Sequence, residues 1–174
     1  MDTLTIFVTQ LTLSIVVFSL LAKWFVGPWL TDKPIHVALV ALTFPHAMRH
    51  VGLSFLVPGL VADSLHDSFA GLAAYGDFVT GLIALLALVA LNGRWGISLP
   101  LVWLFNIVGT VDLVNALRQA ENVPLLLTTW YIPTFFVPLL LVTHFLMFVR
   151  LFKHAFGRSQ SDVGSKPVLS PVHV

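Results

Sequence analysis

The chain has 174 residues, of which 57% are hydrophobic and 10% charged, and its mean hydropathy is +0.94; because soluble domains carry about 25% charged residues, this composition indicates an integral membrane protein. The formal net charge is +1 and the basic residues are scattered, so we expect no nucleic acid as a partner. The absence of cysteine excludes disulfides, thiolate-ligated haem and cysteine-bound iron–sulfur clusters, which leaves histidine and carboxylate as candidate metal ligands.

Hydrophobic runs divide the chain into an all-α bundle of about five transmembrane helices, with four as the alternative. A bilayer core about 30 Å thick needs roughly 20 helical residues per crossing. The expected spans cover residues 3–25, 34–57, 75–91, 97–117 and 125–152. The N-terminal run lacks a basic n-region and a cleavage site, so we interpret it as a retained helix. Residues 1–153 then form a single transmembrane domain, and residues 154–174, rich in Ser, Pro and Gly, a disordered cytoplasmic tail.

Between the spans, the sequence carries several signals for breaks and turns. Gly27-Pro28 is expected to end the first span, and "LVADSLHDSFAGLAAYGD" after Pro58-Gly59 is too polar to cross and is interpreted as a loop with a short interfacial helix. "NGRWG" favours a tight turn between the third and fourth spans. Pro133 and Pro138 should bend or locally unwind the fifth span.

Basic residues near the span ends predict the orientation, because lysine and arginine stay on the cytoplasmic side. Lys23 and Lys33 flank the first loop, Arg94 lies in the third, and further basic residues follow the fifth span. We therefore expect a multi-pass protein of the bacterial inner (plasma) membrane, with the N-terminus outside and the C-terminus cytoplasmic. Arg118 in the fourth loop is the exception to this pattern.

The second span contains the polar motif "FPHAMRHVGL", residues 44–53. On an α-helix, His46, Arg49 and His50 share one face, because residues three and four apart are neighbours. An arginine at a helix centre costs about 3 kcal/mol on insertion scales and needs a counter-charge. Asp77 and Asp112 lie at the matching depth of the third and fourth spans, so we expect them to pair with Arg49.

Alternating span directions predict two polar layers. The expected outer layer contains Arg49, His50, Asp77, Asp112 and Asn115, with Trp130 at the outer interface; the expected central layer contains His46, Asn106 and His144. Asn106 points about 240° away from Asp112 on the helical wheel, so we assign it an interhelical hydrogen bond. The candidate ligand-binding residues are His46, Arg49, His50, Asp77, Asp112, Asn115, Trp130 and His144, and the candidates for catalysis are Arg49, His50, Asp77 and Asp112.

Several functions remain open at this point. Our first hypothesis is a pocket for a small lipophilic or anionic ligand, a lipid or a quinone, in which carboxylates and imidazoles handle protons; whether the protein is an enzyme stays open. A b-type haem held by His46 or His50 and His144 is the alternative. Proton-coupled transport and an accessory subunit of a membrane complex, or a homo-oligomer, are further alternatives. The structural alternative is that Arg49 and the histidines only hold the helices together. We rank a metal ion low because Arg49 would repel it.

Three stretches carry a resemblance to known proteins: "RHVGLSFLVPGL", "AAYGD" and "WLFNIVGTVDLVNAL". With these, the chain resembles small polytopic bacterial membrane proteins of uncharacterised function. Arg49, Gly52, Leu53 and Gly59 also make it similar to the DoxX-type group, over about a quarter of the chain. That resemblance implies quinone-dependent or other membrane redox chemistry. DoxX-type proteins have four spans, so no functional residue is carried over.

Overall fold

The structure, a computed structural model, describes the backbone of residues 1–164 and the side chains up to residue 156. Within this range the chain forms an all-α bundle without β-strands, which confirms the expected fold class. The α-helices are α1 (Thr3–Leu21), α2 (Gly27–Thr31), α3 (Ile35–Ala47), α4 (Asp67–Asn92), α5 (Ser98–Leu117) and α6 (Val137–Gly164). Shorter 3₁₀ helices cover Met48–Leu56, Ala120–Leu125 and Leu127–Trp130, and π-helical turns cover Ala22–Val26 and Ile132–Phe136.

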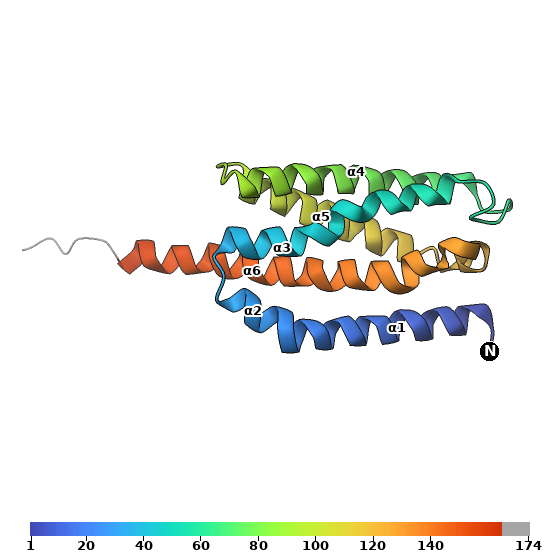
Figure 1. Cartoon of the computed structure of the whole chain (residues 1–174), viewed down its shortest axis with the longest axis horizontal. Coiled ribbons are helices and arrows are strands. Elements are labelled where there is room, and N and C mark those ends of the chain that lie inside the picture. The colour runs from blue at the N-terminus through green and yellow to red at the C-terminus, as the bar shows by residue number, and fades with distance from the viewer. Residues whose placement is uncertain (165–174) are drawn as a thin grey trace, which may run out of the picture.

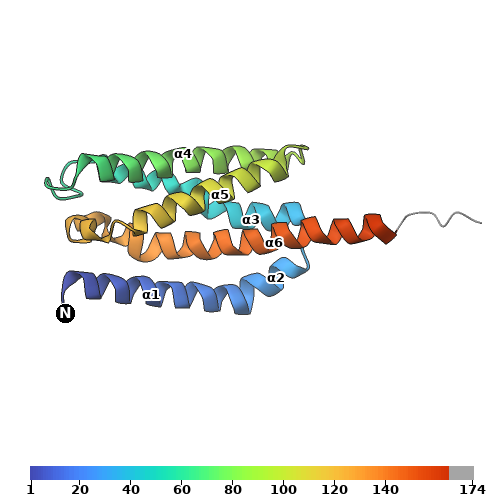
Figure 2. The ribbon, with the colours of Figure 1, turned by 180° about the vertical axis from the view of Figure 1, so that it is seen from behind.

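Four segments of the described chain are long and apolar enough to cross a membrane: Thr3–Thr31, Asp67–Asn92, Ser98–Leu117 and Leu127–Phe156. The second expected span consists of α3 and the 3₁₀ helix Met48–Leu56, which together lie alongside α4 (Figures 1 and 2). The N-terminus lies at one end of the bundle, called here the amino end, and α6 leaves at the other, the carboxyl end (Figure 1). An odd number of passes through the bundle accounts for this separation of the termini.

Three boundaries differ from the expected ones. The first helix does not end at Gly27-Pro28, because the Gly27 N–H bonds to the Ala22 carbonyl in a π turn and Pro28 falls in the first turn of α2, where its missing N–H costs nothing. Helix α4 begins at Asp67, eight residues earlier than expected. Its first turns are not an interfacial helix, because buried Phe69 and Ala74 hold them in the core at the amino end.

The last span follows the expected pattern at its start but not at its end. Around Pro133 the chain winds as a π helix, Ile132–Phe136, which confirms the expected local unwinding. Helix α6 then runs to Gly164, so residues 154–164 are helical and not a disordered tail. No proline interrupts this stretch before Pro167. The rest of the expected tail, residues 165–174, lies outside the described residues.

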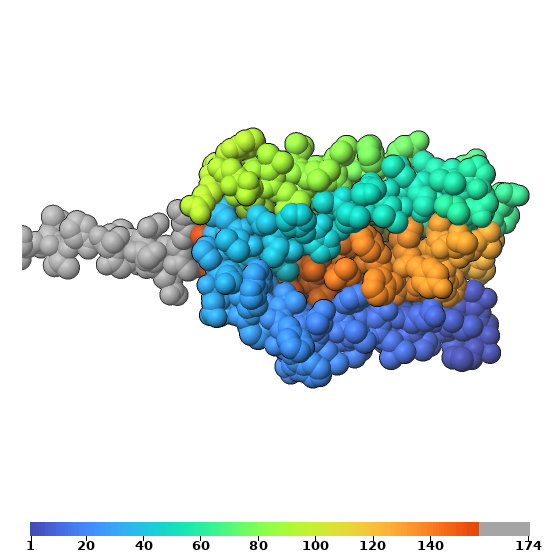
Figure 3. Space-filling model, viewed as in Figure 1, coloured from blue at the N-terminus to red at the C-terminus, as the bar shows by residue number. Residues whose placement is uncertain are grey.

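Two large apolar cores and a small one, formed by Leu113, Val137 and Leu140, fill the bundle of the described residues. The core toward the carboxyl end contains Leu39, Ala84, Leu91, Phe105 and Met147 among its buried residues. The core toward the amino end is built by α1, the 3₁₀ helix Met48–Leu56, the start of α4 and the segment before α6. Helix α1 lies along one edge of the molecule (Figure 3) and buries only 6% of its most apolar window within the protein.

Candidate functional site

The 3₁₀ helix Met48–Leu56 decides which side chains of the second span face the interior. A 3₁₀ helix has three residues per turn, so residues three apart line up on one side. His46, Arg49, Gly52 and Phe55 follow this spacing, and all four are buried. His50 is exposed, and its Nδ1 lies 3.2 Å from the Ala47 carbonyl. The change of helical period therefore corrects the expectation that His50 shares the face of Arg49.

Arg49 is 1% exposed and is held by two aspartates. Its Nε and Nη2 both lie 2.7 Å from Oδ1 of Asp77 on α4. Nη2 also donates to Oδ2 of Asp112 on α5, and Nη1 donates to the Gly109 carbonyl at 3.3 Å. The two expected counter-charges are thus both present, and all three guanidinium nitrogens have protein acceptors.

The ion cluster contains two acidic side chains and one basic side chain. With both carboxyl groups ionised, one arginine faces two aspartates, which leaves a surplus of one negative charge. The Asp77 and Asp112 side chains are 13% and 23% exposed, whereas the Arg49 side chain is 0% exposed. The carboxylates, and not the guanidinium, therefore form the accessible part of the cluster.

Glycines on neighbouring elements make room for these polar side chains. A Cβ at Gly52 would overlap the Asp77 carboxylate, and a Cβ at Gly76 would overlap the Asp112 carboxylate. On α5, a Cβ at Gly109 would lie 2.8 Å from the imidazole of His144. Each polar group thus sits against the bare backbone of the next element, which explains how the charges approach so closely within the bundle.

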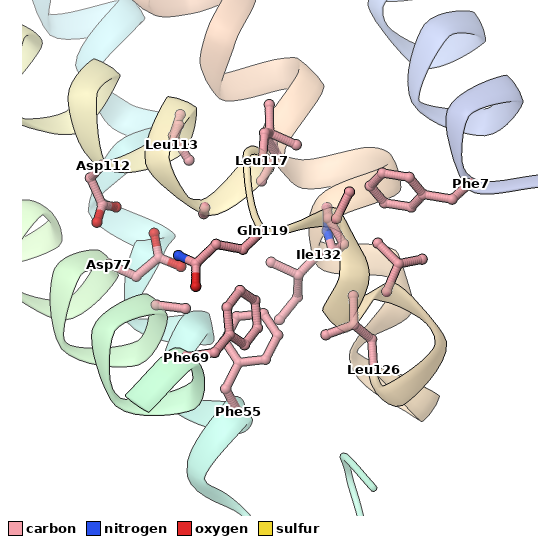
Figure 4. A pocket seen from close by; sticks show the side chains of 16 residues that line it. Phe7, Phe55, Phe69, Asp77, Asp112, Leu113, Leu117, Gln119, Leu126 and Ile132 are labelled. Atoms are coloured by element: carbon pink, nitrogen blue, oxygen red, sulfur yellow. The ribbon is translucent and has the colours of Figure 1, made fainter. Parts of the chain in front are cut away.

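A cavity of about 50 Å³ lies beside the aspartates at the amino end. Asp77 and Asp112 form one wall, with Gln119 next to them (Figure 4). The remaining wall is apolar and includes Phe7, Phe55, Phe69, Ala73, Leu113, Ala116, Leu117, Leu126 and Ile132. At roughly 10–15 Å³ for each water centre, this space holds about three to five water molecules or a small organic group.

Asp112 also faces the outside of the bundle. A groove between α4 and α5 is lined by Tyr75, Gly76, Val108 and Asp112. The Asp112 carboxylate therefore lies between the internal cavity and a groove on the outer surface of the bundle. Asn115 is exposed and lines further hollows on α5 that also contain Asp112.

His46 and His144 form a second polar group, closer to the bundle centre. They are 0% and 1% exposed, and their ring centroids are 4.1 Å apart. The distance from His144 Nδ1 to Asn106 Oδ1 is 2.6 Å, and Asn106 Nδ2 donates to the His144 carbonyl at 3.3 Å. The expected interhelical hydrogen bond of Asn106 is therefore present.

The Asn106 amide defines the tautomer of the His144 ring. An amide oxygen only accepts, so His144 Nδ1 carries the hydrogen. Thr143 Oγ1 lies 2.9 Å from His46 Nε2 and 2.9 and 3.0 Å from the carbonyls of Leu139 and Leu140, so the threonine links the His46 ring to the backbone of α6. His46 Nδ1 and His144 Nε2 have no hydrogen-bond partner among the described residues.

The histidine pair does not fit the haem alternative. A haem iron bound by two imidazoles requires the macrocycle to lie between the rings. Here the rings of His46 and His144 are in contact, and the edge of Phe105 lies against His46 with ring centroids 4.9 Å apart. His50, the other expected ligand, points out of the bundle. The structure therefore leaves no space for a porphyrin at this position.

Trp130 supports the cavity without being part of its described wall. Its Nε1 donates to Gln10 Oε1 at 2.6 Å, and its ring meets Phe7 edge-on, with centroids 5.8 Å apart. Phe7 in turn lines the cavity. Trp130 thus joins α1 to the segment before α6.

The apolar wall of the cavity was not predicted from the sequence. Phe69, Ala73 and Asp77 are four residues apart on α4 and therefore share a helix face. Phe55 lies two 3₁₀ turns after Arg49. These spacings are visible in the sequence, but Phe7 and Gln119 belong to distant segments, and only the folded chain brings them to the cavity.

Comparison with known proteins places the chain in a family. Residues 6–152 match the model of the family described as Domain of unknown function (DUF8737), and the chain belongs to it. No curated protein and no solved structure matches the chain.

Proposed function

We propose that this member of the DUF8737 family is a membrane protein that binds a small lipophilic molecule in the cavity at the amino end, with the polar end of the molecule against Asp77 and Asp112. One observation carries the proposal: two carboxylates, held in place by Arg49, form the polar wall of an otherwise apolar cavity. An apolar cavity with a few convergent polar groups is the usual form of a small-molecule site.

The chemistry of the wall favours a lipophilic ligand over an anionic one. The lining residues include no lysine, arginine or histidine, because Arg49 is enclosed behind the aspartates. A carboxylate beside a ligand hydroxyl or amine can accept or return its proton, so the site also supports acid–base chemistry. A quinol, with its hydroxyl donors, belongs to the ligand classes that such a wall accommodates.

The groove between α4 and α5 supports a route for the ligand from the bilayer. Asp112 borders both this groove and the cavity. A molecule dissolved in lipid would meet the groove on the side of the bundle without passing through water. We propose this lateral side as the entrance.

We also propose that the amino end faces outward and that the protein lies in a bacterial plasma membrane. Asp2, Asp63 and Asp67 belong to the amino end, whereas Lys33, Arg94 and Arg150 belong to the carboxyl end. Basic residues accumulate on the cytoplasmic side. The bound molecule would then sit in the outer half of the membrane.

Filling the cavity tests the proposed function. Ala116→Leu adds bulk to the cavity wall, whereas Ala41→Leu adds the same bulk on the exposed face of α3. We expect mass spectrometry of the protein in nanodiscs, titrated with 1-butanol, to show binding to the wild type and to Ala41→Leu but a loss of binding in Ala116→Leu. Equal binding by all three proteins, or by none, would contradict the proposal.

A further inference from the structure

The charge balance of the cavity wall indicates the class of its ligand, and we infer that the cavity binds a small lipophilic ammonium ion in exchange for a proton. This inference rests on the proposed function, since it names the ligand of the same cavity. Asp77 and Asp112 outnumber Arg49, the one basic partner of both carboxyl groups. Arg49 can neutralise one of the two aspartates, and no basic side chain lines the cavity.

A surplus charge in a membrane-embedded site needs a neutralising partner. Moving an ion into a low-dielectric interior is costly unless an opposite charge accompanies it. When the cavity is empty, a proton on one carboxyl group balances the cluster. When a cation enters, it takes over this role and the proton leaves, so binding and proton release are linked.

The wall offers specific contacts to an ammonium head. Three N–H donors of a primary ammonium match the oxygens of Asp77, Asp112 and the Gln119 amide, which lie together at one side of the cavity (Figure 4). The rings of Phe55 and Phe69 lie next to Gln119 in this view, with centroids 6.2 Å apart. Aromatic faces attract cations by about 0.5–2 kcal/mol.

The same wall disfavours a bare inorganic cation. Hard cations such as Mg²⁺ and Ca²⁺ take about six to eight oxygen ligands. Among the side chains that line the cavity, only Asp77, Asp112 and Gln119 carry oxygen, and the rest are apolar. An alkyl group would contact this apolar surface, whereas a metal ion would leave it unused.

Three molecules of similar shape and different charge test the inference: n-butylammonium, 1-butanol and butyrate. Calorimetric titration of the protein in nanodiscs, with empty nanodiscs as the blank, should show n-butylammonium binding at least about tenfold more tightly than 1-butanol. Butyrate should not bind. Repeating the titration in buffers with different heats of ionisation should show release of about one proton for each ammonium ion bound.

Asp112→Asn removes the surplus charge and should abolish the preference for n-butylammonium while 1-butanol still binds. The matched control is Asp63→Asn, in an exposed loop away from the cavity, which should keep the preference. Phe69→Leu provides a second variant that leaves the ion cluster intact. It should weaken n-butylammonium binding about two- to fivefold, with little change for 1-butanol.

The outcomes separate the two proposals. If none of the three molecules binds, the cavity is not a ligand site and the proposed function is wrong. If 1-butanol or butyrate binds as tightly as n-butylammonium, or if ammonium binding releases no proton, the cavity remains a ligand site but the inference about its ligand is overturned. A preference retained in Asp112→Asn would also overturn it.

Discussion

Toward the carboxyl end, the space between α3, α4, α5 and α6 is filled by aliphatic and aromatic side chains such as Leu39, Ala87 and Phe105, all of which are at most 2% exposed. Toward the amino end, the 3₁₀ helix Met48–Leu56, α4 and α5 form an ion cluster against glycine backbone, and α1 and the segment before α6 help to enclose a cavity beside it. The two ends of one bundle therefore differ in what fills the space between their helices. The carboxyl end is filled by apolar side chains, whereas the amino end combines an apolar core with an ion cluster and a cavity.

The largest expected effect comes from removing the arginine that holds the amino end together. Arg49→Met leaves Asp77 and Asp112 without their counter-charge, and removing one partner of a buried ion pair costs about 3–5 kcal/mol. We expect a large fall in thermal stability in nanodiscs. The triple variant that also carries Asp77→Asn and Asp112→Asn should recover much of the stability, because no charge is left unpaired. A triple variant as unstable as Arg49→Met would show that Arg49 stabilises by packing and not by charge.

A smaller effect is expected from filling the space that a glycine leaves for an aspartate. The added methyl of Gly76→Ala would collide with the Asp112 carboxylate, whereas a methyl added at Gly71, on the same helix, would meet no atom within 4 Å. Overpacking typically costs about 1–3 kcal/mol. We expect Gly76→Ala to lower the unfolding temperature and weaken ligand binding, and Gly71→Ala to keep or slightly raise stability. Similar results for both would contradict the role assigned to Gly76.

The smallest effect is expected at the carboxyl end. Leu39→Ala opens space in a well-packed core, and such changes cost roughly 2–5 kcal/mol in water-soluble proteins. In a bilayer, separated helices stay in lipid, so only the packing contribution is lost and we expect about 1–2 kcal/mol. Thermal unfolding should show this loss, while the affinity for n-butylammonium stays unchanged. A change in affinity would show that the two ends are coupled.

Residue pairing across the helices was predictable to a useful extent. Arg49 needs a counter-charge in lipid, and the depth of Asp77 and Asp112 along their spans points to both partners. The same reasoning predicts His46, Asn106 and His144 in one layer, where they are in contact. Depth along a span follows from residue number, because each helical residue advances by a constant rise.

The direction in which each side chain points, into the bundle or out of it, was less predictable. An α-helical period predicts His50 in the pocket, and the 3₁₀ helix moves it to the exposed side. Asn115 is exposed and lines hollows on the surface of α5, and Trp130 contacts Phe7 instead of the cavity. The two helix types differ by about 20° per residue, and the difference accumulates over a turn. A local change of helix type therefore alters which side chains meet.

From its sequence alone, this protein is an all-α membrane bundle whose buried arginine requires acidic partners, because hydropathy and the cost of an unpaired charge in lipid depend only on residue type and spacing. The tertiary structure decided that Arg49 is enclosed while Asp77 and Asp112 border a cavity, and that Phe7, Phe55 and Gln119 complete its wall. These features depend on how distant segments approach one another, and the approach depends on where glycine backbone admits a neighbouring side chain.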